Sequence, residues 1–138
     1  MDSTILVVSG LSRERRENGW DLLDWLKEIK LEINAMYWFF DKDWTAWRLM
    51  IATPLVDSEG PLYVYDKIIP FVKEKFTDED GLFEDQVYIS SPGMNEVRDI
   101  IRRNGAVLPE RRVIRRISEE EPYIYCLKKS VEGVGVAA

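Results

Sequence analysis

The sequence lacks histidine altogether and contains a single cysteine, Cys126. The absence of histidine removes the commonest general base near neutral pH, all Ser–His and Cys–His nucleophiles, and zinc sites that need imidazole. One cysteine can form neither an internal disulfide nor a metal cluster, which is typical of proteins in a reducing cytoplasm. Its aromatic surroundings, YIYCLKK, favour a buried, inert thiol over a reactive one. We therefore predict a cytoplasmic location.

Long apolar runs are also missing. Residues 5–8 are apolar, but the stretch is too short to cross a membrane, and no basic segment typical of a signal peptide precedes it. The triplet Gly133-Val134-Gly135 is followed by only a short tail, so it cannot be a phosphate loop that opens a helix. The sequence therefore predicts no membrane partner and no cofactor.

Length and charge narrow the class of protein. A chain of 138 residues with 46% hydrophobic residues normally forms one domain with a real core. We expect that domain to span residues 1–129, with residues 130–138 as a disordered tail. The net charge of −6 repels phosphate and argues against general binding to nucleic acid or to a membrane surface.

Residues 31–54 contain the strongest pattern, two apolar segments joined by a short acidic turn. Residues 32–40 and 46–53 are rich in aromatic and β-branched residues, and DKDWT between them is typical of a turn. Strands joined so closely pair in antiparallel fashion. Both faces of the predicted hairpin are apolar, which indicates a central place in a sheet that is covered on two sides, or covered on one side and packed against a partner chain on the other. Arg48 is its one unusual polar residue.

The remaining elements complete an α+β pattern. We expect a helix after Ser12, a second helix entered through Gly60 and Pro61 with Asp57 or Ser58 as its cap, and a third that Ser91 caps. A short strand is predicted at residues 86–90, and a second hairpin at residues 112–117 and 123–128. The order α-β-β-α-β-α-β-β indicates a mixed or antiparallel sheet of about five strands with roughly three helices.

Three phrases of this sequence resemble a family of small bacterial proteins. They are AMYWFFDKDWTAWRLMIATPLVDSEGP at residues 35–61, VYISSP at residues 87–92 and PYIYCL at residues 122–127. The most specific part is the WRLxIATPLVDxEGP pattern, and the similarity covers most of residues 20–128. The resemblance implies no activity, cofactor or catalytic residue, because none is assigned to that family.

Carboxylates are the remaining candidates for catalysis or metal binding. Asp41 and Asp43 at the hairpin tip could hold Mg²⁺, although a solvated turn explains the same residues. Asp57 and Glu59 follow a strand end and precede a helix, which is a common place for a site. A helix cap explains Asp57 without a ligand.

Charge segregation is a further signal. Residues 98–118 contain seven arginines and two acids, a net charge of +5. Four of these arginines, Arg111, Arg112, Arg115 and Arg116, could grip the phosphates of a nucleic acid. Alternatively, the arginines pair with the acidic groups of the protein itself or of a second copy, and the acidic total favours this interpretation.

We therefore consider three functions. The first is a non-enzymatic protein-interaction module that associates with itself as a homodimer through its aromatic hairpin. The second is a nucleic-acid-binding accessory protein that uses the four arginines. The third, an enzyme that uses carboxylates and a divalent metal, has the weakest support, so an enzymatic role is the less favoured interpretation.

Overall fold

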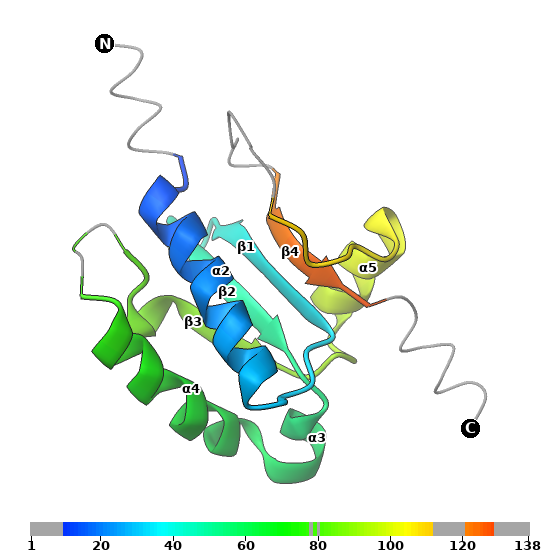
Figure 1. Ribbon diagram of the computed structural model, residues 1–138. Coiled ribbons are helices and arrows are strands. Elements are labelled where there is room, and N and C mark those ends of the chain that lie inside the picture. Colours follow the sequence, from blue (N-terminus) through cyan, green and yellow to red (C-terminus); the bar gives the residue numbers. More distant parts are fainter. Residues whose placement is uncertain (1–9, 78, 80, 112–120, 129–138) are drawn as a thin grey trace.

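The sheet of this α+β domain has four strands in the computed structural model, which describes residues 10–77, 79, 81–111 and 121–128. The strands are β1 (Ala35–Asp41), β2 (Ala46–Ala52), β3 (Val87–Ser90) and β4 (Tyr123–Leu127), in the spatial order β3-β2-β1-β4 (Figure 1). β1 pairs in antiparallel fashion with β2 and β4, whereas β2 and β3 are parallel. The sheet is therefore mixed, one of the two arrangements that the sequence predicts, and the described residues contain four strands rather than about five.

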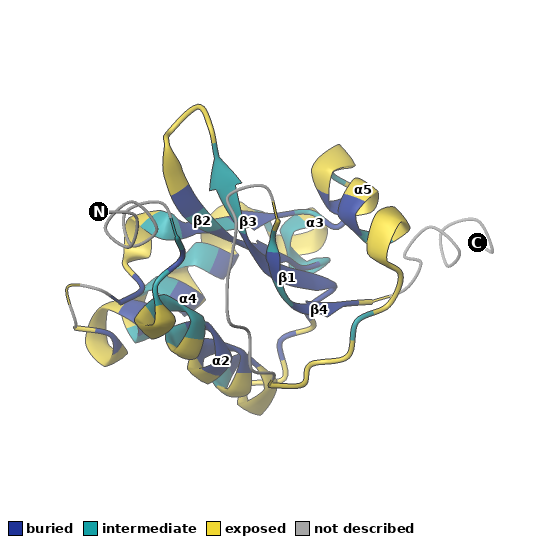
Figure 2. Ribbon diagram, turned by 90° about the horizontal axis from the view of Figure 1, so that it is seen from above, coloured by how far each residue is buried: buried dark blue, intermediate teal, exposed yellow. Residues whose placement is uncertain are grey.

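Helices cover both faces of this sheet (Figures 1 and 2). The described residues contain four α-helices where the sequence predicts roughly three: α2 (Arg13–Glu28), α3 (Leu55–Glu59), α4 (Pro61–Lys75) and α5 (Asn95–Asn104). A 3₁₀ turn, η1 (Glu84–Gln86), precedes β3. Residues of α2 and α4 share one hydrophobic cluster with the sheet, and residues of α5 share a second one.

The predicted hairpin is the centre of the sheet. Its seven residue pairs run from Ala35 opposite Ala52 to Asp41 opposite Ala46. Trp38 and Leu49 are fully buried toward α2 and α4, and Tyr37 packs on the opposite face with α5. The prediction that both faces are covered is confirmed, because apolar residues alternate into two separate cores.

Helix α2 begins as predicted. The Ser12 hydroxyl accepts a hydrogen bond from the Arg15 backbone N–H and caps the first turn. Gly19 lies inside the helix without interrupting it, and the fully buried Tyr125 side chain of β4 packs against it. Any side chain at position 19 would collide with the Tyr125 hydroxyl, so this glycine provides space for close packing of helix and sheet.

The connection from β2 to β3 corrects one prediction. Asp57 and Ser58 do not cap α4, because both lie inside the short helix α3, and Gly60 is the residue before α4. Gly60 adopts a φ of +90°, which permits the sharp bend between the two helices. Pro70 lies inside α4 without dividing it and is exposed, although it has no N–H to donate within the helix.

The start of α5 also differs from the prediction. The helix begins at Asn95, so Ser91 does not cap it. Instead, the Ser91 hydroxyl donates to Asp57 and accepts from the Gly93 N–H, which stabilises a turn ahead of the helix. Gly105, with a φ of +70°, ends α5.

β4 is the second strand of the predicted C-terminal hairpin. The first, at residues 112–117, lies outside the described residues, as does the predicted tail at 130–138. Leu127 exchanges two backbone hydrogen bonds with Val107. The pairing opposite the end of β4 therefore starts closer to α5 than the sequence predicts.

Candidate functional site

A cleft of about 500 Å³ lies on the α5 side of the hairpin. Its walls come from the ends of β1 and β2, from Tyr88 of β3, from α5, and from Pro122 just before β4. Figure 2 shows the exposed end of the hairpin projecting beyond the rest of the sheet. The cleft therefore combines segments that are far apart in the sequence.

Aromatic rings form much of its surface. Phe39 lies between Tyr37 and Tyr88, with ring centroids 6.1 and 6.5 Å away, respectively. Trp44 lines the cleft from the hairpin turn and is 71% exposed, the largest exposure of any aromatic side chain among the described residues. Next to it, Thr45 adopts a φ of +50°, an unusual conformation for a β-branched residue.

Arg48 occupies the centre of this surface. Its guanidinium lies 4.8 Å from the centroid of the Tyr88 ring and 5.4 Å from that of Trp44. It also forms an ion pair with the Asp41 carboxylate at 3.5 Å. A guanidinium stacks favourably on aromatic faces while its N–H groups bind a carboxylate, so one residue connects three parts of the cleft.

Tyr37 provides a hydroxyl in the deeper part of the cleft. The residue is only 4% exposed, and within the described ranges its hydroxyl has no hydrogen-bond partner. Burial raises the pKa of Tyr37 well above its usual value, and the nearby negative charge of Glu96 raises it further. The hydroxyl therefore stays protonated and available as a neutral donor or acceptor.

Carboxylates outnumber basic groups around the cleft. Among the described residues, four acids line it, Asp41, Asp43, Glu96 and Asp99, against two arginines, Arg48 and Arg103. Asp41 pairs with Arg48 and Asp99 with Arg102, whereas Asp43 and Glu96 form no ion pair with a described residue. The cleft as a whole therefore favours a cationic ligand over an anionic one.

The structure brings both predicted metal ligands, Asp41 and Asp43, to this cleft. Asp41 uses one carboxylate oxygen for Arg48 and accepts the Asp43 backbone N–H with the other, at 3.0 Å. No group of three or more acidic, cysteine or histidine side chains suited to a metal occurs among the described residues. The turn interpretation of the sequence accounts for the contacts of Asp41.

The other predicted acids, Asp57 and Glu59, lie elsewhere. They belong to α3 and do not line the cleft. The Asp57 carboxylate accepts a hydrogen bond from the Ser91 hydroxyl at 3.1 Å, which connects α3 to the loop after β3. Glu59 is exposed. Asp57 therefore connects a helix with a loop at this end of the sheet.

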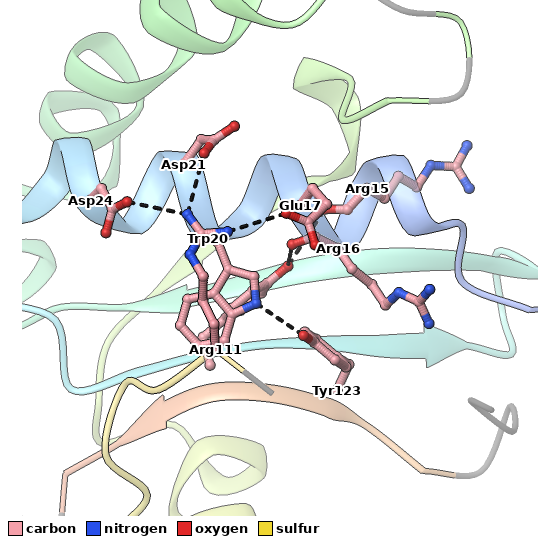
Figure 3. A network of polar contacts seen from close by, with 9 residues as sticks. Arg15, Arg16, Glu17, Trp20, Asp21, Asp24, Arg111 and Tyr123 are labelled. Carbon is pink, nitrogen blue, oxygen red and sulfur yellow. Dashed lines mark hydrogen bonds and ion pairs between the residues drawn. The ribbon is translucent and has the colours of Figure 1, made fainter. Parts of the chain in front are cut away.

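Arg111 is the one residue of the predicted phosphate-binding group within the described ranges; Arg112, Arg115 and Arg116 lie outside them. Its guanidinium contacts three carboxylates of α2, from Glu17, Asp21 and Asp24, at 3.2 to 3.4 Å (Figure 3). It also lies 5.5 Å from the centroid of the Trp20 ring. Burial alone would lower the pKa of Arg111, but the two aspartates more than offset it and raise the pKa.

A second cavity of about 630 Å³ lies between the end of α2 and the segment that pairs with β4. Cys126 and the exposed Leu108 are among its lining residues. Burial raises the pKa of the Cys126 thiol, in agreement with the predicted inert role. Among the described residues that line this cavity, the acidic one is Glu32, and it is paired with Lys128. The second cavity therefore offers fewer free polar groups to a ligand than the cleft.

Sequence reasoning missed the contribution of Tyr88, Glu96 and Arg103 to the cleft. These residues come from β3 and α5, and only the strand order places them beside the hairpin. Two signals in the sequence pointed there: a tryptophan in an acidic turn and an arginine, Arg48, within an apolar strand.

Comparison with known proteins gives no match to a family model, a curated protein or a solved structure. The resemblance to a bacterial family therefore stays a prediction. Within the described ranges, no helix has both the length and the apolar character needed to cross a membrane.

Proposed function

We propose that this protein is a non-enzymatic protein-interaction module that binds its partner at the cleft between the β1–β2 hairpin and α5. The first partner to consider is a second copy of the chain. The observation that carries the proposal is Trp44, a large apolar side chain that is 71% exposed at a cleft lined by other aromatic rings. Tryptophan is enriched among the residues that dominate binding energy at protein interfaces.

The surroundings of Trp44 support a role in binding rather than in folding. Its ring contacts the partly buried Arg48 but belongs to neither hydrophobic core. A protein gains little stability from a side chain that stays in water, whereas burying it in an interface removes up to about 200 Å² of apolar surface. Exposed apolar side chains beside a cleft are typical of interaction sites.

Sedimentation velocity over a range of protein concentrations tests the proposal. We expect reversible association of the wild-type chain in the micromolar range and a loss of it in Trp44→Ala. The matched control is Leu62→Ala, which removes a similarly exposed apolar side chain, 74% exposed, from α4 outside the cleft. A clean monomer at high micromolar concentration, or equal association of Trp44→Ala and wild type, would contradict the proposal.

Nucleic-acid binding is the second candidate, and Arg111 weakens its support. Three carboxylates surround that guanidinium, so a phosphate would have to approach against their repulsion. Binding of single-stranded oligonucleotides at low salt, lost when Arg115 and Arg116 become alanine, would favour this function instead.

A further inference from the structure

The cleft already holds one guanidinium, and the way it does so indicates what else it can bind. Arg48 lies over Tyr88 and Trp44 and pairs with Asp41. Two aromatic faces and one carboxylate compensate a planar cation for the favourable hydration that it loses when it leaves water.

Similar groups remain unused beside Arg48. Most of the Trp44 side chain is exposed, and the carboxylates of Asp43 and Glu96 have no ion-pair partner among the described residues. The Tyr37 hydroxyl lines the same cleft from a residue that is more than nine-tenths buried, and it has no hydrogen-bond partner in the described part of the chain. Among the described residues, the buried polar side-chain atom without a partner is Asn34 Oδ1, so the Tyr37 hydroxyl is open to the cleft and can hydrogen-bond a ligand or water there.

We propose that the cleft recognises an arginine side chain of the partner protein, stacked on Trp44 and hydrogen-bonded to Glu96 or Asp43. This inference rests on the proposed function, because it names the side chain that the interaction site takes. The excess of carboxylates over guanidinium groups at the cleft favours a cation. Arginine suits the site better than lysine, since its planar fork stacks on an indole ring and donates to a carboxylate at the same time.

The geometry also explains why a phosphate is disfavoured at this position. The basic group in contact with the Trp44 ring is the Arg48 guanidinium, and the Asp41 carboxylate already neutralises its charge. Arg103 is the other arginine among the described residues that line the cleft, and Glu96 and Asp99 lie on the same helix and line the same cleft. An anion would therefore meet more repulsion than attraction there.

The test uses two blocked peptides, tetra-arginine and its citrulline counterpart, which keeps the side-chain shape but lacks the charge. We expect tetra-arginine to shift the amide signal of Glu96 and the indole N–H signal of Trp44 in NMR spectra of the full chain. Binding should weaken with added salt, and the citrulline peptide should give no shift. Glu96→Gln should weaken binding about two- to fivefold, in the upper part of the range for a single exposed ion pair.

Glu74→Gln is the matched control, because Glu74 is an exposed carboxylate of α4 that does not line the cleft. Equal binding of the citrulline peptide, or equal weakening by Glu74→Gln and Glu96→Gln, would overturn the inference. If association of the chain depends on Trp44 but the arginine peptide does not bind, the inference fails and the proposed function stands. If Trp44→Ala leaves association unchanged, the proposed function fails, whatever the peptide does.

Discussion

Gly19→Ala provides the sharpest test of how α2 packs on the sheet. In the middle of a helix, this change normally stabilises a protein by about 1 kcal/mol. Here a Cβ at position 19 would lie 1.8 Å from the hydroxyl oxygen and 2.2 Å from the Cζ atom of Tyr125. Both distances are far below van der Waals contact, so either the ring or the helix must move.

Tyr125 has little freedom to move. Its side chain is fully buried, its hydroxyl donates to the Arg16 carbonyl at 2.8 Å, and it accepts a hydrogen bond from the Trp38 indole N–H at 2.9 Å. Overpacking of a core costs about 1–3 kcal/mol. Leaving the buried indole N–H without a partner costs a further 1–3 kcal/mol or so. Against the gain of about 1 kcal/mol in helix propensity, we expect a net loss of about 1–5 kcal/mol in the free energy of unfolding.

Urea unfolding followed by tryptophan fluorescence measures this difference. Tyr125→Phe removes the oxygen at 1.8 Å but keeps the ring carbon at 2.2 Å. In a Tyr125→Phe background, Gly19→Ala should therefore still lower the free energy of unfolding, but by less than in the wild-type chain. Glu28→Ala, at an exposed position of the same helix, is a control that should stay within about 0.5 kcal/mol of wild type. A Gly19→Ala variant as stable as wild type, or more stable, would refute this account of the packing.

Three further predictions concern the cores. Burial raises the pKa of Tyr37 above its usual value of 10. As the pH rises, this tyrosine therefore ionises first in the unfolded chain, and the free energy of unfolding falls above about pH 10. For this group the fall is roughly 1.4 kcal/mol per pH unit. Tyr37→Phe should reduce the dependence of the free energy of unfolding on pH in this range, measured by urea unfolding at several pH values. An unchanged dependence would show that Tyr37 is not its source. Cys126 is buried, so its thiol should react with a disulfide reagent much more slowly in the folded chain than in urea, and equal rates would show that it is accessible. Trp47→Ala should lower the free energy of unfolding by about 3–5 kcal/mol. Phe39→Ala should lower it by less, because Phe39 is only partly buried. Losses below about 1 kcal/mol for both variants would mean that the hairpin contributes little to the core.

The hairpin could be predicted because its signals are local. Apolar and aromatic residues occupy both sets of alternate positions from Ala35 to Phe40, and the acidic turn leaves one short connection. Alternation fixes which residues share a face, so Tyr37 and Trp38 fall into different cores, as observed. No knowledge of the other elements is needed for this result.

Helix starts were harder to predict because a capping residue has other uses. Ser91 and Asp57 both suit an N-cap position, yet their side chains bond to each other and hold α3 against the loop after β3. The two residues are 34 positions apart. Local pattern cannot distinguish a serine that caps its own helix from one that binds a distant carboxylate.

The cleft could not be predicted from the sequence because its residues come from distant segments, but Arg48 indicated one part of it. An arginine on an otherwise apolar strand breaks the pattern that builds the core, and such a break needs a local compensation. The structure supplies it: Asp41 neutralises the charge, and Trp44 and Tyr88 cover the guanidinium. This arrangement also holds Trp44 beside the cleft, so Arg48 positions the residue that we propose to bind. A change of Arg48 to methionine would keep much of the side-chain volume and suit the core pattern better, yet it should release Trp44 and weaken association. Retained stability with lost association would separate the two roles, whereas unchanged association would show that Arg48 does not position Trp44 for binding.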